Sequence, residues 1–325
     1  MHILITGAAG MIGRKLAERL AKDGAVAGAP INKLTLIDVV APTKPAFAGS
    51  VETATADLSV PGAAAKALAA RPDVIFHLAA VVSGEAETDF DKGYAVNLDG
   101  TRALLEAIRK SGDGYKPKVI FTSSIAVFGA PFPPAIPDEF HLTPLTSYGT
   151  QKAICELLLA DYTRRGFCEG VGIRLPSICV RPGKPNKAAS GFFSSIIREP
   201  LAGREAVLPV ADTVAHTHAS PRAAVGFLVH AAGLAREQLG ARINLTMPGV
   251  SCTVAEQIAS LRRIAGDKVA ARIRREPDAL IMRIVDGWPQ RVDARRATAL
   301  GFRAETSFDD IVRSHIDDEL GGKIA

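Results

Sequence analysis

The sequence predicts an α/β protein with a doubly wound parallel sheet in its first half and a smaller α+β lobe in its second half. Three observations carry this prediction. Short apolar runs alternate with helical segments over residues 1–175, the first run leads into a glycine-rich turn, and the alternation weakens after Arg174. We expect a first domain over 1–175 and a substrate lobe over 176–325, with elements that can interleave.

The first half contains six expected strands and four expected helices. The strands are 2–6, 34–39, 51–55, 74–80, 118–123 and 171–175, and the helices are 11–22, 61–70, 90–111 and 148–165. The runs at 74–80 and 118–123 are almost entirely apolar, which is typical of strands that helices cover on both faces.

The second half is less regular. Residues 174–190 are rich in Pro and Lys and predict a long loop over a site. Helices are expected at 221–238, 253–265, 277–286 and 307–319, with short strands near 242–247 and 268–274. These segments predict the smaller lobe.

Composition and charge exclude several classes of protein. Residues 1–150 carry 14 Lys and Arg against 15 Asp and Glu, whereas residues 151–325 carry 25 against 19. The basic second half favours small anionic ligands. Without a Lys/Arg run that has interleaved aromatics, we expect no nucleic-acid partner.

The cysteines and the apolar segments indicate the compartment. The four cysteines have no metal-ligand spacing, so we expect reduced thiols and no metal site. No apolar stretch approaches the roughly 18–20 residues of a membrane helix, and the N-terminal residues do not resemble a secretory signal. We expect a cytoplasmic protein without a membrane partner.

Strand 2–6 leads into the sequence TGAAGMIG, which contains Gly7, Gly10 and Gly13. Glycines suit a pyrophosphate site because a side chain would hold the ligand away from the backbone. The N-terminus of the next helix, with Met11 and Ile12, supplies unpaired N–H groups and a positive dipole. This strand, turn and helix predict a Rossmann-type nucleotide site.

Two acidic positions follow the next strands. Asp38 ends strand 34–39, where its carboxylate would accept both ribose hydroxyls and repel a 2′-phosphate, which favours NAD over NADP. A solvated strand end is the alternative. Asp57 and Leu58 would lie near the adenine, but Asp57 could equally cap a turn.

Tyr148 and Lys152 lie four residues apart at the start of helix 148–165, so they share one face. A phenol, with an ordinary pKa of about 10, is a poor base at neutral pH unless a neighbouring cation favours the phenolate. In isolation the pair could be an ordinary helix face. However, strand 118–123 brings Ser123 and Ser124 to the sheet edge where parallel sheets bind ligands.

With HLAA at 77–80, Asn97, TSS at 122–124 and YGTQK at 148–152 in this order, the chain resembles the extended short-chain dehydrogenase/reductase superfamily. That superfamily also contains nucleotide-sugar epimerases and dehydratases. The resemblance covers most of residues 1–180 and implies an NAD-dependent enzyme.

The resemblance also implies roles for single residues. Tyr148 would be the acid/base, and Lys152 would bind the nicotinamide ribose and lower the pKa of Tyr148. Ser124 would hydrogen-bond the reacting oxygen, with Ser123 as the alternative. Leu78, Ala79 and Ala80 would line the cofactor, and Asn97 would hold the local backbone.

Departures from the superfamily pattern narrow the reaction. Ile125 and Ala126 replace the Asp-Glu pair of the dehydratases, so we do not expect dehydration. Val214 stands where nucleotide-sugar epimerases have an Arg that clamps the diphosphate, which favours a smaller substrate.

Segments 77–90, 146–162 and 174–190 are similar to the D-erythronate dehydrogenase group of this superfamily. The resemblance implies oxidation of a four-carbon sugar acid at C2 with NAD. The third segment offers cations near the place where the substrate carboxylate must be held, namely Arg174, Arg181, Lys184 and Lys187. A solvated basic loop is the alternative, at least for Lys184 or Lys187. We expect Arg181 to be the carboxylate ligand, and Asn186, Ser190 and Ser83 to contact substrate hydroxyls.

Three histidines could suggest other chemistry. His77 lies in a buried strand, where a hydrogen-bonded core residue is the better interpretation. His216 and His218 would point to one face of a strand, but no carboxylate at a suitable spacing completes a metal site.

Two alternative functions stay open. One is a nucleotide-sugar 4-epimerase that retains NAD, and the other is a non-catalytic NAD-sensing protein, a class that typically loses the Tyr or the Lys. The resemblance further implies a homodimer through helices 90–111 and 148–165.

Overall fold

The computed structural model describes residues 1–183 and 190–325. Within these residues, seven parallel strands form one sheet in the order β12-β8-β7-β6-β1-β4-β5. They are β1 (His2–Thr6), β4 (Lys33–Asp38), β5 (Ser50–Thr55), β6 (Val74–His77), β7 (Lys118–Ser124), β8 (Glu169–Leu175) and β12 (Asn244–Thr246). The predicted doubly wound parallel sheet is confirmed.

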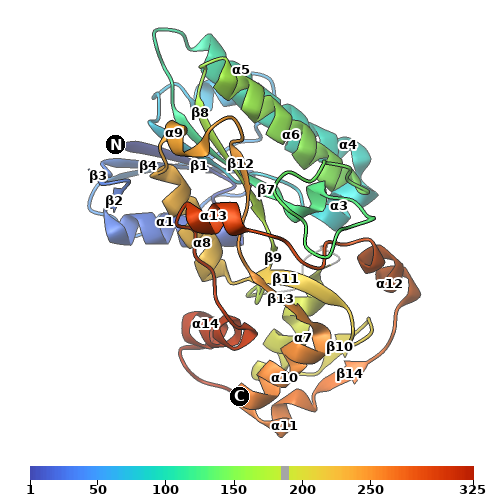
Figure 1. The fold of residues 1–325 in the computed structure, drawn as a ribbon. Helices are drawn as coiled ribbons and strands as arrows, with labels where there is room; N and C mark the ends of the chain where they lie inside the picture. Colours follow the sequence, from blue (N-terminus) through green and yellow to red (C-terminus); the bar gives the residue numbers. More distant parts are fainter. Residues whose placement is uncertain (184–189) are drawn as a thin grey trace.

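Helices cover both faces of this sheet (Figure 1). On one face lie α1 (Met11–Asp23) and α8 (Pro221–Ala232), and on the other α2 (Ala63–Ala67), α5 (Gly100–Lys110) and α6 (Ser147–Arg164). The central strands bury their apolar side chains on both faces, and Ile3, Leu4 and Ile5 of β1 are fully buried. A short hairpin of β2 (Ala25–Val26) and β3 (Ala29–Pro30) follows α1.

Several expected elements differ in detail. Near the expected strand 268–274, residues Asp267–Ala270 form a helix and only Ile273–Arg275 form a strand, and the expected helix 221–238 is divided at residues 233–235. Strand β6 ends at His77 rather than at residue 80, because the next residues turn aside to pack against Gly7. The expected helix 90–111 is divided into α4 (Phe90–Gly93), a π-helical turn (Tyr94–Asp99) and α5, and is preceded by α3 (Ser83–Thr88). Periodicity alone could not reveal a π-helical turn, because its neighbours continue the helical pattern.

A second lobe lies below the sheet in Figure 1. Its strands are β9 (Ser177–Ile178), β10 (Ala206–Leu208), β11 (Ala215–Ala219), β13 (Val250–Thr253) and β14 (Ile273–Arg275). Its helices are α7 (Gly191–Leu201), α10 (Val254–Ala265), α11 (Asp267–Ala270), α12 (Ala279–Asp286) and α14 (Phe308–Leu320). A separate apolar core holds this lobe together. None of the helices in the described ranges is both long and apolar enough to cross a membrane.

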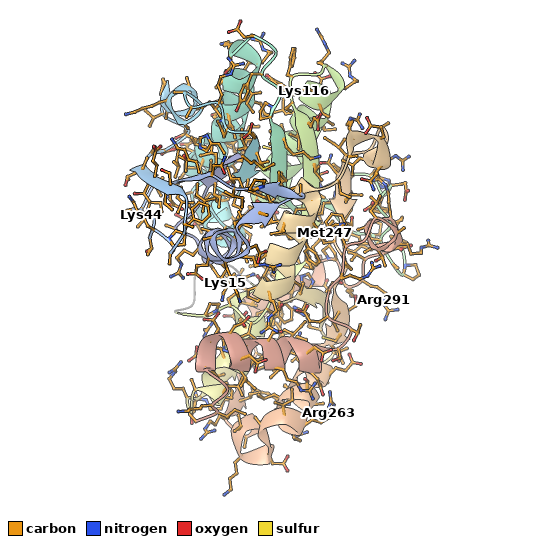
Figure 2. The ribbon with its side chains drawn as sticks, turned by 90° about the vertical axis from the view of Figure 1, so that its left-hand side faces the viewer. Lys15, Lys44, Lys116, Met247, Arg263 and Arg291 are labelled. Atoms are coloured by element: carbon orange, nitrogen blue, oxygen red, sulfur yellow. The ribbon has the colours of Figure 1, made fainter. Side chains whose placement is uncertain are left out.

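Part of the second half of the chain returns to the first core. Strand β12 pairs with β8 at the sheet edge, and α8, α9 (Arg236–Leu239) and α13 (Arg295–Ala299) lie beside the sheet. Met247 accordingly lies in the sheet-bearing part of the molecule, whereas Arg263 lies in the lower lobe (Figure 2). We propose that the two lobes are defined by their cores rather than by one boundary at residue 175.

Candidate active site

The glycine turn after β1 packs directly against the end of β6. Gly7 has a φ of +74°, and a Cβ on it would lie 2.7 Å from the backbone nitrogen of Ala79. A Cβ on Gly13 would lie 2.2 Å from the Gly7 carbonyl oxygen. The turn therefore requires both glycines for its own packing, and it brings Leu78 and Ala79 beside the expected pyrophosphate site.

Gly10 plays a different part in this turn. It precedes α1 as an exposed residue whose helix end has no side-chain cap, in front of Met11 and Ile12. An uncapped helix N-terminus with no side chain over it is suited to bind an anion. The residues present therefore fit the pyrophosphate of a dinucleotide.

Asp38 lies at the end of β4, beside the glycine turn. Its Oδ2 accepts a hydrogen bond from the Ala9 nitrogen at 2.9 Å, and its Oδ1 accepts one from the Val40 nitrogen at 3.1 Å. A carboxylate has about four acceptor positions, so both oxygens retain capacity for ribose hydroxyls.

Asp57 is occupied by its own turn. Its Oδ1 accepts from the nitrogen of Ser59 at 2.9 Å and from its hydroxyl at 2.7 Å. This is the turn-capping role that the sequence left open. Leu58 beside it is buried, and contact of either residue with an adenine stays a prediction.

Asn97 holds the segment that follows Ala80. Its Oδ1 accepts from the Val81 nitrogen at 2.9 Å, and its Nδ2 donates to the Gln151 Oε1 at 2.7 Å. The π-helical turn presents Asn97 to both groups. Gln151, which is fully buried and lies between Tyr148 and Lys152 on α6, was not predicted from the sequence as part of the site.

Tyr148 and Ser124 meet where α6 begins. Thr146 caps the helix by accepting a hydrogen bond from Gly149 at 3.1 Å, which fixes the first turn that carries Tyr148. A Cβ on Gly149 would lie only 2.2 Å from the Ala126 carbonyl oxygen. The absence of that atom lets the helix approach the end of β7 closely.

The pKa of Tyr148 depends on several neighbours. Burial raises it to about 12, whereas the positive charge of Arg181 and a hydrogen bond with Ser124 lower it. Arg181 is thus a cation near Tyr148 that the sequence did not assign to this effect, and a lowering of the Tyr148 pKa by Lys152 stays a prediction. Tyr148 is thus a hydrogen-bonded phenol next to an arginine.

Lys152 lies on the same face of α6 as Tyr148, as the spacing predicts. Its Nζ lies 5.7 Å from the centre of the Tyr148 ring and donates to the Thr122 carbonyl oxygen at 2.8 Å. Burial lowers the pKa of Lys152 to about 8, opposed by Cys155 and Glu156. This ammonium is oriented by the end of β7.

Arg181 is held on the second-lobe side of the site. Its Nε donates to the Ile178 carbonyl at 3.0 Å, and its Nη2 donates to the Ser190 hydroxyl at 2.9 Å. Ser83, the first residue of α3, is half-buried. Asn186, Lys184 and Lys187 lie outside the described residues.

Arg174 does not serve as a substrate cation. It is buried and forms a forked ion pair with Glu156, with its Nη2 2.8 Å from the Glu156 Oε2. The prediction that Arg174 faces the substrate carboxylate is wrong. The charge pattern could not distinguish this ion pair from a ligand, because the partner lies 18 residues away in the sequence.

The three histidines considered in the sequence, His77, His216 and His218, lie in hydrogen-bonded core positions. His77 lies between the hydroxyls of Thr6 and Thr101, at 2.7 and 2.9 Å, which confirms the core interpretation. His216 contacts the Ser177 hydroxyl at 2.8 Å, and His218 lies beside Gln257. Burial lowers the pKa of His77 to about 3 and that of His216 to about 4. Among residues 1–183 and 190–325, no three His, Cys, Asp or Glu side chains gather as a metal site would require.

Comparison with known proteins identifies the family. The model of the NAD dependent epimerase/dehydratase family matches residues 3–216. The chain belongs to this family. The D-erythronate dehydrogenase of Cupriavidus necator is 50% identical over 98% of both chains. That of Haemophilus influenzae is 41% identical over 98% of this chain and all of its own.

A solved structure shares the complete fold. It is described as the nucleoside-diphosphate-sugar epimerase from Agrobacterium tumefaciens, and it is 65% identical with a TM-score of 0.98. The match covers 100% of this chain and 96% of that one. The relatives of this chain thus carry both dehydrogenase and epimerase names.

Proposed function

We propose that this protein is an NAD-dependent dehydrogenase that oxidises D-erythronate at C2 to 2-dehydro-D-erythronate. The observation that carries the proposal is the arrangement at the start of α6: Tyr148 shares a hydrogen bond with Ser124, and the Lys152 Nζ lies 5.7 Å from the centre of the Tyr148 ring. Arg181, whose positive charge acts on Tyr148, adds a cation suited to a carboxylate. The two relatives named D-erythronate dehydrogenase support this choice of substrate.

NAD would be held by the first lobe. Gly10 and the N-terminus of α1 would bind the pyrophosphate, and Asp38 would accept the adenosine ribose hydroxyls. Leu78, Ala79 and Ala80 would lie along the cofactor, and Lys152 would donate to the nicotinamide ribose. When bound, NAD supplies the hydride acceptor.

The proposed chemistry uses Tyr148 and Ser124 on one oxygen. As the phenolate, Tyr148 accepts the proton of the C2 hydroxyl while C2 gives up its hydride, and Ser124 donates a hydrogen bond to the developing carbonyl. The alcohol thus loses one proton and one hydride to become a ketone. Tyr148 then passes its proton to solvent and returns to the phenolate.

The substrate carboxylate would bind Arg181, because a guanidinium can donate two parallel hydrogen bonds to it. The Arg181 backbone nitrogen donates to the Ser194 hydroxyl at 3.0 Å, and the Arg181 Nε donates to the Ile178 carbonyl oxygen. The Arg181 side chain is therefore oriented before a ligand binds. Ser83 and Asn186 remain our candidates for the substrate hydroxyls.

A sugar-nucleotide epimerase is the second candidate, favoured by the description of the Agrobacterium structure. An epimerase returns the hydride to its substrate, so NAD would copurify and no net NADH would form. Val214 in place of a diphosphate-binding arginine supports the dehydrogenase instead.

A spectrophotometric screen tests the proposal. Purified protein is mixed with NAD or NADP and with C4 to C6 aldonates, and NADH formation is followed. We expect D-erythronate with NAD to give the highest kcat/KM. Interconversion of UDP-hexoses without net NADH, together with no signal from any aldonate, would reject the dehydrogenase assignment.

We also propose a homodimer in the cytoplasm, formed through α5 and α6. The exposed apolar residue Leu157 of α6, with a relative exposure of 66% in the single chain, would lie in this interface. Sedimentation with a Leu157→Lys variant as control tests the pairing. A monomeric parent protein would contradict it.

A further inference from the structure

Glu156 is a fully buried carboxylate in the middle of α6. Its Oε1 accepts a hydrogen bond of 2.5 Å from the Ser123 hydroxyl and one of 2.9 Å from the Arg174 Nε. Its Oε2 accepts from the Arg174 Nη2 at 2.8 Å. One side chain therefore joins helix α6 to the neighbouring strands β7 and β8.

These contacts lie beside the candidate catalytic residues. Glu156 follows Lys152 by one helical turn and Tyr148 by two, so all three lie along one side of α6. Its partner Ser123 directly precedes Ser124 in β7. A movement of the Ser123 hydroxyl away from Glu156 would carry Ser124 away from Tyr148.

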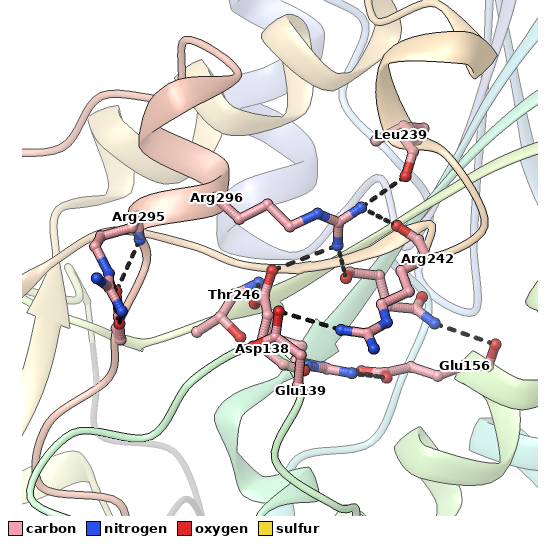
Figure 3. Close-up of polar contacts among 11 residues, drawn as sticks. Asp138, Glu139, Glu156, Leu239, Arg242, Thr246, Arg295 and Arg296 are labelled. Atoms are coloured by element: carbon pink, nitrogen blue, oxygen red, sulfur yellow. Dashed lines mark hydrogen bonds and ion pairs between the residues drawn. The ribbon is translucent and has the colours of Figure 1, made fainter.

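The arginine of this pair is itself held in place. Its Nη1 donates to the Asp138 carbonyl oxygen at 3.0 Å, and the Asp138 carboxylate accepts from the Thr246 nitrogen at 2.7 Å. Arg296 lies 3.5 Å from the same carboxylate, as Figure 3 shows with Glu156 nearby. The network thus extends from α6 to β12 at the edge of the sheet.

A buried ion pair adds little net stability compared with well-packed apolar side chains, because both charges lose their hydration. The function of this ion pair is therefore better sought in the positions that it fixes. The Ser123 hydroxyl donates a further hydrogen bond to Glu156, from the strand that also carries Ser124.

We propose that Glu156 is a positioning residue: held by Arg174, it fixes Ser123 and thereby the distance of Ser124 from Tyr148. This inference rests on the proposed dehydrogenase function. In this proposal Glu156 acts through Ser123 rather than by contact with substrate or cofactor.

The first test removes only the link between helix and strand. Ser123→Ala keeps the Glu156–Arg174 pair intact, and we expect kcat for D-erythronate to fall by up to about 100-fold with KM for NAD unchanged, because a misplacement of about 1 Å in a reacting group has such an effect. Ser123→Thr keeps a hydroxyl and should restore much of the rate.

Ser260→Ala is the matched control. The Ser260 hydroxyl donates to Asp309 at 2.6 Å, and Asp309 also pairs with Arg263, so this triad in the second lobe resembles the first one. A loss of kcat in Ser260→Ala equal to that in Ser123→Ala would show a general stability effect and overturn the proposal. So would a Ser123→Ala enzyme with wild-type kcat.

The second test removes the charge but keeps an acceptor. The titratable groups facing Lys152 are His77 of β6, Tyr148, and Cys155 and Glu156 of α6, and Glu156 raises the pKa of Lys152. In Glu156→Gln the pKa of Lys152 should fall, so the loss of activity that follows deprotonation of Lys152 should begin at lower pH. Ser123→Ala should lower kcat without changing the pH at which this loss begins. An unchanged alkaline pH dependence in Glu156→Gln would contradict the effect of Glu156 on Lys152.

An activity-free measurement separates this inference from the choice of substrate. Hydrogen exchange in segment 118–127 of Ser123→Ala should become faster, whereas Ser260→Ala should leave that segment unchanged. If the wild-type enzyme does not oxidise D-erythronate, the proposed function is wrong. The hydrogen exchange of segment 118–127 still tests whether Glu156 positions Ser123. Unchanged exchange in Ser123→Ala would reject that positioning role.

Discussion

The backbone at Gly149 lies directly against the backbone at Ala126, so a Cβ on Gly149 would stand 2.2 Å from the Ala126 carbonyl oxygen. Real Cβ atoms do not approach a carbonyl this closely, and the neighbouring atom is backbone that cannot turn away. The contact fixes how closely Tyr148 approaches Ser124.

Gly149→Ala should therefore push the first turn of α6 away from β7. We expect kcat to fall about 100-fold, since misplaced reacting groups lose rates of this order, while NAD binding stays within a few-fold of the wild type. Steady-state kinetics and NAD titration measure the two quantities. A Gly149→Ala enzyme with normal turnover would show that this close contact is not needed.

Tyr148→Phe removes the proposed proton acceptor and leaves the ring in place. Turnover should fall by about 10² to 10⁴, the usual contribution of a positioned acid/base, with the Kd for NAD little changed. Turnover close to that of the wild type would exclude Tyr148 as the base.

Arg181→Gln should affect both substrate binding and pH dependence. The KM for D-erythronate should rise, because the carboxylate loses its cation. Since Arg181 lowers the pKa of Tyr148, its removal raises that pKa, and the rise of activity with pH should shift to more alkaline pH. Kinetics as a function of pH test both effects, and Lys15→Gln on α1 serves as a charge-matched control. A changed KM with an unmoved pH profile would separate the two roles and reject the electrostatic one.

The buried histidines predict how stability depends on pH. The folded-state pKa values of His77 and His216, about 3 and about 4, lie below the ordinary value of 6.5. The unfolded chain therefore binds more protons between these values, so the stability contribution is complete above about pH 6.5 and decreases as pH falls toward 4. Thermal unfolding from pH 8 to pH 4 measures it. His77→Gln should flatten part of this dependence, and a Tm independent of pH below 6.5 would contradict the prediction.

The sheet and helix α6 could be predicted from the sequence because both depend on local patterns. The run of β1, the glycines after it and the Tyr148–Lys152 spacing each carry their signal within a few residues. By contrast, the partner of Arg174 and the cation near Tyr148 depend on contacts between distant segments. Gly149 and Gln151 were visible inside the selected motif, but only their neighbours in space explain them.

The position of β12 in the first sheet could not be predicted from the local sequence either. A three-residue strand near residue 245 could join either lobe, and its burial beside β8 decides the matter. Pairing with β8 and packing against α13, not strand propensity, place it in the first sheet.

The return of β12 and α8 to the first core has a practical consequence for engineering. The second lobe is built from three separate parts of the chain, about 176–220, 250–290 and 307–325, because α8 with β12 and then α13 return to the first core. A chimera that exchanges this lobe with that of a relative therefore needs a junction at each passage of the chain between the two cores. A recombinant with a single crossover near residue 176 would take β8 from one parent and its neighbouring edge strand β12 from the other. The parents should therefore be matched first at the residues where these two strands pair.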